Sequence, residues 1–112
     1  MIRGEIRWAN FGIPYGSEAG YTRPVLIVQD NCLNESKIRT IVVLPLTTNL
    51  NLAEAPGNVF LRKKDSKLIS DSVIIVSQLY AIDRGKIKEK IYKVSREIID
   101  QVEVGIKLVL GI

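Results

Sequence analysis

Polar side chains stand at the ends of three apolar segments, and they are the first candidates for chemistry. Arg23 directly precedes the apolar segment 24–28, and Gln78 follows the apolar segment 73–76. The polar run at the end of segment 42–46 is Thr47, Thr48 and Asn49. A side chain at a strand end is held firmly by the sheet while its tip stays open to a ligand, as a functional site requires. The spacing therefore predicts a site built from the ends of neighbouring strands.

Each candidate also has a structural alternative. Arg23 can form a surface ion pair, residues 47–49 are an ordinary turn sequence because their side chains bond locally to the backbone, and Gln78 can satisfy a buried backbone group. The aromatic residues that could stack on nucleobases are Trp8, Tyr15, Tyr21, Tyr80 and Tyr92. Trp8 also suits a core or a dimer interface. The residues alone leave open a nucleic-acid-binding barrel and a generic interaction domain.

The composition excludes several kinds of site. The chain of 112 residues has no His, which removes Ser-His-Asp and Cys-His catalysis and the HExxH metallohydrolases. A lone Cys32 makes neither an intrachain disulfide nor a Cys/His zinc site, and Asp65, Asp71 and Asp83 are scattered singly. No phosphate-binding GxxxxGK[ST] loop is present. We expect no metal and no cofactor.

Charge and hydropathy indicate the partner and the compartment. Residues 1–56 carry no net charge, whereas residues 57–112 carry +4, with basic clusters at residues 62–67 and 84–96. Clustered Lys and Arg suit a phosphate-rich or acidic partner, although lysines also serve solubility alone. No apolar run approaches the ~18 residues that suggest a membrane span. With no secretory leader either, we expect a soluble cytoplasmic protein.

The elements that position these residues are mostly strands. Strands are expected at residues 5–11, 24–30, 40–46, 58–61, 72–76 and, as an edge strand, 90–94. Residues 77–83 fit either a helical turn or a strand extension, and loops are expected at 12–22 and 48–57. Ser95 is the expected N-cap of a terminal amphipathic helix, in which Gly105 is a weak point. This pattern predicts one domain over residues 1–112, a small, strongly bent, mainly β barrel with a terminal helix packed on it.

Four motifs in order give the chain a family resemblance. They are RGEIRW at residues 3–8, GSExGxxRPVLIV at 16–28, VLPLTT at 43–48, and DSVI at 71–74 with QLxxID at 78–83. Together with the terminal helix, they resemble the PemK/MazF-type toxins of bacterial toxin–antitoxin pairs. The resemblance implies an SH3-like barrel of the PemK/CcdB type, a homodimer, and sequence-specific, ribosome-independent cleavage of single-stranded RNA. It also implies a cognate antitoxin, which we expect to be acidic. Trp8, strand 73–76 and the apolar helix are the expected dimer surface.

The resemblance also assigns site residues. The family's catalytic Arg falls on Arg23 and its catalytic Thr on Thr47, while Glu18 matches an acidic loop residue and is the best candidate for a base. The expected RNA-binding residues are Ser17, Thr48, Asn49, Gln78, Arg84 and Lys86. RNA supplies its own 2′-OH nucleophile, so these groups need only hold the geometry and stabilise charge on the phosphoryl oxygens. A gyrase-poisoning or other protein-binding toxin on the same barrel, without nuclease activity, is the alternative.

Overall fold

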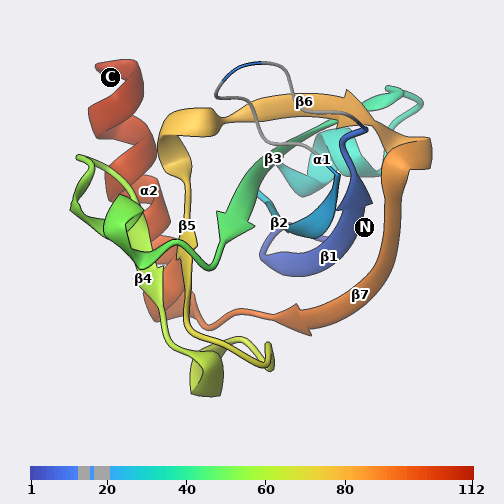
Figure 1. Cartoon of the computed structure of the whole chain (residues 1–112). Coiled ribbons are helices and arrows are strands. Elements are labelled where there is room, and N and C mark those ends of the chain that lie inside the picture. The colour runs from blue at the N-terminus through green and yellow to red at the C-terminus, as the bar shows by residue number, and fades with distance from the viewer. Residues whose placement is uncertain (13–15, 17–20) are drawn as a thin grey trace.

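A seven-stranded antiparallel sheet curls around an apolar core, and one long helix packs against it (Figure 1). The computed structural model describes residues 1–12, 16 and 21–112. The strands are β1 (Glu5–Asn10), β2 (Thr22–Ile27), β3 (Thr40–Thr47), β4 (Val59–Leu61), β5 (Ser72–Ile74), β6 (Tyr80–Asp83) and β7 (Ile87–Lys93). The helices are α1 (Asn31–Asn34) and α2 (Arg96–Leu110). Short 3-10 turns are η1 (Leu50–Glu54), η2 (Lys63–Asp65), η3 (Val76–Gln78) and η4 (Arg84–Lys86).

All six expected strands are present, with shifted ends. The segment left open at 77–83 contains both alternatives, because η3 is a helical turn and β6 is a strand. The edge strand is confirmed but begins at Ile87, three residues earlier than expected, since Ile87 is buried and pairs with Ala9 of β1. The predicted terminal helix is also confirmed, and the Ser95 hydroxyl accepts a 3.3 Å hydrogen bond from the Ile98 N–H as its N-cap.

The long strand β3 organises the sheet. It pairs with β2 along one edge, and along the other edge first with β6 and then with β5. Leu44 and Leu46 belong to the apolar cluster that α2 covers, whereas Ile41 and Val43 belong to the cluster on the opposite face. This alternation puts two consecutive residues at the end of β3 on different faces.

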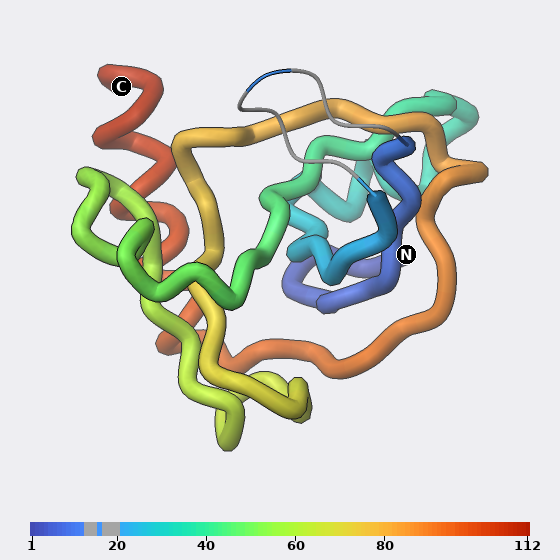
Figure 2. Tube along the Cα trace, viewed as in Figure 1, coloured from blue at the N-terminus to red at the C-terminus, as the bar shows by residue number. Residues whose placement is uncertain are grey.

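A close backbone approach fixes α2 against the rest of the chain. In Figures 1 and 2, the loop that contains η1 lies beside α2. A Cβ atom built on Gly105 would collide with the Gly57 carbonyl oxygen, and Gly57 itself has a left-handed φ of +88°. Gly105 is therefore not a weak point of the helix but the place where the loop backbone rests on it.

We expect Gly105→Ala to destabilise the protein by about 1–3 kcal/mol, because the added methyl group overpacks this contact. In an open helix the same change stabilises by about 1 kcal/mol, so the sign of the effect is diagnostic. Urea unfolding measures it, with Gln101→Ala at an exposed position of the same helix as the control. A Gly105→Ala protein as stable as its parent would contradict the packing described here.

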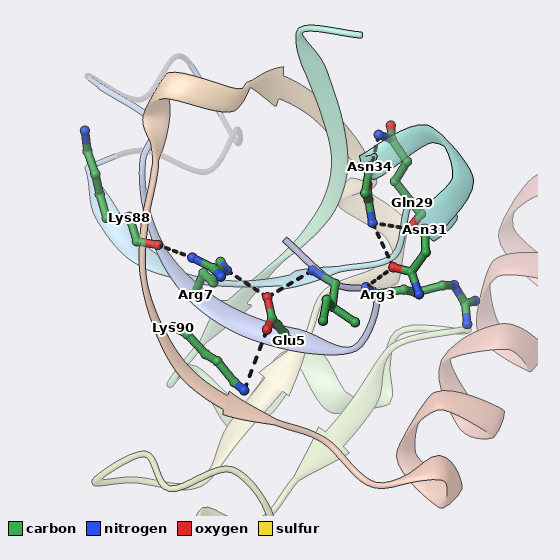
Figure 3. A network of polar contacts seen from close by, with 9 residues as sticks. Arg3, Glu5, Arg7, Gln29, Asn31, Asn34, Lys88 and Lys90 are labelled. Atoms are coloured by element: carbon green, nitrogen blue, oxygen red, sulfur yellow. Dashed lines mark hydrogen bonds and ion pairs between the residues drawn. The ribbon is translucent and has the colours of Figure 1, made fainter. Parts of the chain in front are cut away.

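A buried carboxylate ties β1 to the edge strand (Figure 3). Glu5 is 4% exposed and accepts hydrogen bonds from Arg7 Nε at 2.9 Å and the Ile2 N–H at 3.0 Å. Its other oxygen lies 3.6 Å from Lys90 Nζ, and Arg7 Nη1 donates to the Lys88 carbonyl at 3.0 Å. Burial raises the pKa of Glu5, but the Arg7 and Ile2 hydrogen bonds and the positive charges of Arg7 and Lys90 outweigh it. The pKa of Glu5 therefore lies below its ordinary value.

A carboxyl with a lowered pKa stabilises the fold above its unfolded pKa of about 4.5 and loses this contribution as the pH falls through the folded value. We expect Glu5→Gln to reduce the free energy of unfolding at pH 7 by about 1–3 kcal/mol. The difference from the parent should shrink below pH ~4.5. Denaturant unfolding at several pH values tests this, with the exposed Glu35→Gln as control. A difference that stays constant across this pH range would exclude the linkage.

Candidate functional site

The register of β2 and β3 sets Arg23 opposite Thr47. The last paired residues of the two strands are Val25 and Pro45, and two residues further along each strand stand Arg23 and Thr47. Both side chains are half-buried, and Arg23 pairs across β1 with the fully buried Ala9. Two residues that are 24 positions apart in the sequence are thereby brought to one place on one face of the sheet.

Two prolines explain why the ladder stops just before this pair. The Pro45 carbonyl accepts a 2.9 Å hydrogen bond from the Ile75 N–H on the β5 side. Backbone groups alternate in direction along a strand, so the N–H and C=O of the next residue, Leu46, point toward β2. Opposite Leu46 stands Pro24, which has no N–H to donate. The β2–β3 ladder ends there, while Leu46 and Thr47 continue to pair with β5. The sequence thus opens the sheet at the point where its candidate side chains stand.

A pocket of about 210 Å³ lies where the two strands part. Its apolar walls are Trp8, Pro24, Leu46, Leu68 and Ile69. Its hydroxyl-bearing residues are Thr47, Thr48, Ser70 and Ser72. Residues 68–70 belong to the connection between β4 and β5, and sequence reasoning missed them. The only signal for them is an apolar pair, Leu68 and Ile69, within a polar segment.

The turn that follows Thr47 is held by its own side chains. Thr47 Oγ1 accepts from the Asn49 N–H at 3.2 Å, and Asn49 Oδ1 accepts from the Asn51 N–H at 3.3 Å and caps η1. The structural alternative for residues 47–49, a locally bonded turn, is therefore confirmed for two of the three. Thr48 is exposed and lies on the rim of the pocket. The Thr47 hydroxyl is thus held at the strand end by a short local bond.

The remaining candidates that the structure describes lie in short 3-10 turns outside β3. Gln78 is half-buried in η3, which packs against α2 and β3. Arg84 lies at the far end, where Thr40 pairs with Asp83; the full length of β3, ~23 Å, separates it from Thr47. Its guanidinium donates to two backbone carbonyls, those of Asn34 at 3.0 Å and Ile38 at 2.8 Å.

The candidates Arg84 and Lys86 lie away from the pocket. Lys86 is exposed in η4, beside Arg84. The strand register sets Arg23 opposite Thr47, with Thr48 next along the chain on the other face, and Arg84 and Lys86 lie at the far end of β3. Ser17 and Glu18 lie outside the described residues, as does Tyr15.

Two features are absent from the part of the chain that the structure describes. Across residues 1–12, 16 and 21–112, no group of three or more Cys, Asp or Glu side chains is arranged to hold a metal ion. In the same part of the chain, no helix has the length and apolar character needed to cross a membrane.

Comparison with known proteins identifies relatives along the whole chain. The sequence profile of the PemK-like, MazF-like toxins of type II toxin–antitoxin systems matches residues 2–110. The chain is 34% identical over 112 residues to endoribonuclease MazF6 of Mycobacterium tuberculosis and to endoribonuclease MazF2 of Mycobacterium bovis. In both cases the match covers 100% of this chain and 98% of the relative.

Solved structures show the same architecture. MazF from Deinococcus radiodurans superposes with a TM-score of 0.82 at 21% identity, covering 100% of this chain and 97% of that one. A mycobacterial endoribonuclease in complex with its cognate antitoxin gives a TM-score of 0.80 at 20% identity, with coverage of 100% and 96%. These likenesses confirm the expected mainly β barrel architecture with a C-terminal helix.

Proposed function

The chain belongs to the PemK-like, MazF-like toxin family of type II toxin–antitoxin systems, and from this premise we propose that it is a sequence-specific endoribonuclease that cuts single-stranded RNA. The observation that carries the proposal is the position of Arg23 opposite Thr47, two residues beyond the last paired residues of β2 and β3. The relatives described above are named endoribonucleases, which favours a nuclease over a gyrase-poisoning or other protein-binding toxin. We assign the activity to one domain that spans residues 1–112.

In the proposed reaction, the 2′-OH of the RNA attacks the adjacent phosphorus and the 5′-oxygen of the next nucleotide leaves. Arg23 stabilises charge on the phosphoryl oxygens through its planar fork of donors, and this guanidinium keeps its own protons. The Thr47 hydroxyl donates to a phosphoryl oxygen or orients the 2′-OH, and Glu18 takes the proton from the 2′-OH. The 5′-oxygen leaves with the electron pair of the broken P–O bond and takes a proton from solvent water, so the products are a 2′,3′-cyclic phosphate and a 5′-OH end. Neither a metal nor a ribosome is required.

The test is to incubate the purified protein with a long mixed-sequence RNA in EDTA and to map the cut ends. We expect discrete cuts at one short motif, each with a 2′,3′-cyclic phosphate and a 5′-OH end. The Arg23→Ala protein, purified in the same way, controls for contaminating nucleases. An intact RNA, or cuts that the Arg23→Ala protein reproduces, would refute the proposed activity. We also propose that the protein acts in the cytoplasm, because its proposed substrate is messenger RNA.

We further propose a homodimer, on the evidence of exposed apolar residues. Along α2, Val104 and Leu108 are exposed at a spacing of four residues, and Ile112 continues this row just beyond the helix end. An apolar row of this kind suits a second copy of the chain. The expected contribution of residues 73–76 is wrong, because the chain itself already buries them. Light scattering at micromolar concentration should give the mass of two chains.

The proposed antitoxin is an acidic, largely disordered segment that folds on binding and covers Arg23 and the basic residues. It would then compete with RNA for one surface. A competition titration between a 2′-deoxy-substituted RNA and the antitoxin, at two salt concentrations, tests this. RNA binding should weaken steeply with salt because phosphate contacts release counterions, and antitoxin binding should weaken less. A ternary complex with undiminished RNA affinity would rule out competition.

A further inference from the structure

We propose that Asn58 is a positioning residue for the Thr47 hydroxyl. Its side chain clamps the loop that joins β3 to β4, residues 48–58, and a chain of hydrogen bonds runs from this clamp back to Thr47. The inference rests on the proposed function, because it takes the Thr47 hydroxyl to contact the reacting phosphate. It gives a role in the reaction to a residue that does not itself touch the RNA.

The loop needs a clamp because burial does not hold it. None of residues 48–58, which the structure describes in full, is buried. The loop leaves β3 directly after Thr47 and runs to the side of α2 before β4 begins (Figure 1). A segment with few buried apolar contacts opens locally at a low cost in free energy. The polar contacts of the loop therefore decide how firmly the residues after Thr47 are held.

Asn58 makes the polar contacts at the end of this loop. Its Oδ1 accepts from the Ser77 N–H at 3.1 Å and from the Ser77 hydroxyl at 3.2 Å. Its Nδ2 donates to the Leu52 carbonyl at 3.0 Å. A backbone N–H can only donate and a carbonyl can only accept, so these partners fix the orientation of the amide. One half-buried side chain thereby joins η1 to η3.

The clamp is fastened to rigid parts of the fold. The Ile75 N–H, at the start of η3, donates to the Pro45 carbonyl of β3 at 2.9 Å. The residue before Asn58 is Gly57, and its backbone lies so close to Gly105 of α2 that no side chain fits between them. The end of the loop is therefore fixed to both β3 and α2, and the clamp can restrain whatever the loop holds.

A chain of hydrogen bonds leads from the clamp to the Thr47 hydroxyl. The Leu52 carbonyl accepts from Asn58, and the Leu52 N–H donates to the Asn49 carbonyl at 3.2 Å. The Asn49 N–H in turn donates to Thr47 Oγ1 at 3.2 Å. Asn49 contributes only backbone groups to this chain, since its side chain caps η1. The last bond occupies one lone pair of the Thr47 hydroxyl, restricts its rotation and leaves its proton for a phosphoryl oxygen.

A double-mutant cycle tests whether Asn58 acts through Thr47. At saturating RNA, Asn58→Ala should lower the single-turnover rate of cleavage about 3- to 30-fold, because the hydroxyl loses its fixed orientation. This is less than the ~10²-fold expected for loss of the hydroxyl itself. In the Thr47→Ala protein the same change should have no further effect. An unchanged rate, or an equal loss in both backgrounds, would overturn the proposal.

A second variant removes one link only. Asn58→Asp keeps an acceptor for Ser77 but loses the donor to the Leu52 carbonyl, so it should lower the rate as Asn58→Ala does. The matched control is Asn51→Ala, an exposed asparagine of the same loop that joins the network only through its backbone N–H. Urea unfolding in parallel identifies any variant that is not folded. A rate at the parent level in Asn58→Asp would show that the bond to Leu52 does not position Thr47.

Amide hydrogen exchange, followed by NMR, gives a readout that needs no activity. In Asn58→Ala, the amides of Leu52 and Asn49 should exchange about 3- to 30-fold faster, whereas those of β1 and β2 should exchange as in the parent. A merely structural role would instead lower the stability of the whole protein and accelerate all of these amides together. Unchanged exchange at Asn49 would contradict the chain of hydrogen bonds.

The outcomes separate this inference from the proposed function. A protein that cuts no RNA, but in which Asn58→Ala accelerates exchange at Asn49, refutes the nuclease and keeps Asn58 as the residue that holds the loop at Thr47. A protein that cuts RNA equally fast with and without the Asn58 side chain keeps the nuclease and refutes the positioning role.

Discussion

Arg23→Ala should lower the rate of RNA cleavage by about 10²–10³-fold, the typical cost of removing one preorganised donor from a developing oxyanion. The fold should persist, because Arg23 stands at the end of β2 with a half-buried side chain. Cleavage of an oligonucleotide that contains the mapped motif, measured under single-turnover conditions, gives the rate of the chemical step. Unfolding by urea, measured in parallel, separates catalysis from stability.

Arg23→Lys distinguishes shape from charge at the same position. A lysine keeps the positive charge but lacks the planar fork, so we expect it to fail nearly as badly as alanine. The matched control is Arg39→Ala, since Arg39 is an exposed arginine that forms a 3.4 Å ion pair with Asp83 at the opposite end of β3. A rate at the parent level in Arg23→Ala would remove this guanidinium from the mechanism.

The pattern of the sequence predicted the elements because each follows from local chemistry. β-branched runs specify the buried strands, and Ser95 with the apolar spacing that follows it specifies α2. The early start of β7 was not predicted because Ile87 stands among lysines in the sequence. Its burial depends on pairing with Ala9 of β1. Gly105 was misjudged for the same reason, since its role depends on Gly57, 48 positions away in the chain.

The candidate site was predicted only in part. Arg23 and Thr47 were found because each stands at the end of an apolar run, and the structure adds that the two ends meet. The pocket could not be predicted from the sequence, because Trp8 and Ile69 line it from segments that are far apart in the chain and share no pattern. Arg84 was included because of its basic neighbours, but its guanidinium binds backbone carbonyls at the far end of β3. Charge along a sequence does not reveal which cations the fold already uses.

The second large effect is expected at Thr47, and its neighbour provides the comparison. Thr47 and Thr48 are adjacent, but alternation along β3 places Thr47 on the face that Arg23 shares and Thr48 on the face of Leu46. Thr47→Ala should therefore lower the cleavage rate by about 10²-fold, as expected for a lost hydroxyl donor at the phosphate. Thr48→Ala should lose much less activity, and its effect should fall on sequence preference.

A structural role for Thr47 predicts something else, because its Oγ1 also accepts the Asn49 N–H. Thr47→Ser keeps both the hydroxyl and this turn bond, so it should restore most of the cleavage rate. Asn49→Ala removes the cap of η1 but keeps the Thr47 hydroxyl. It should therefore lower the free energy of unfolding while changing the cleavage rate little. Single-turnover rates and urea unfolding of the four variants decide between the two roles. Equal losses of rate in Thr47→Ala and Thr48→Ala would show that the face of the sheet does not determine which hydroxyl acts.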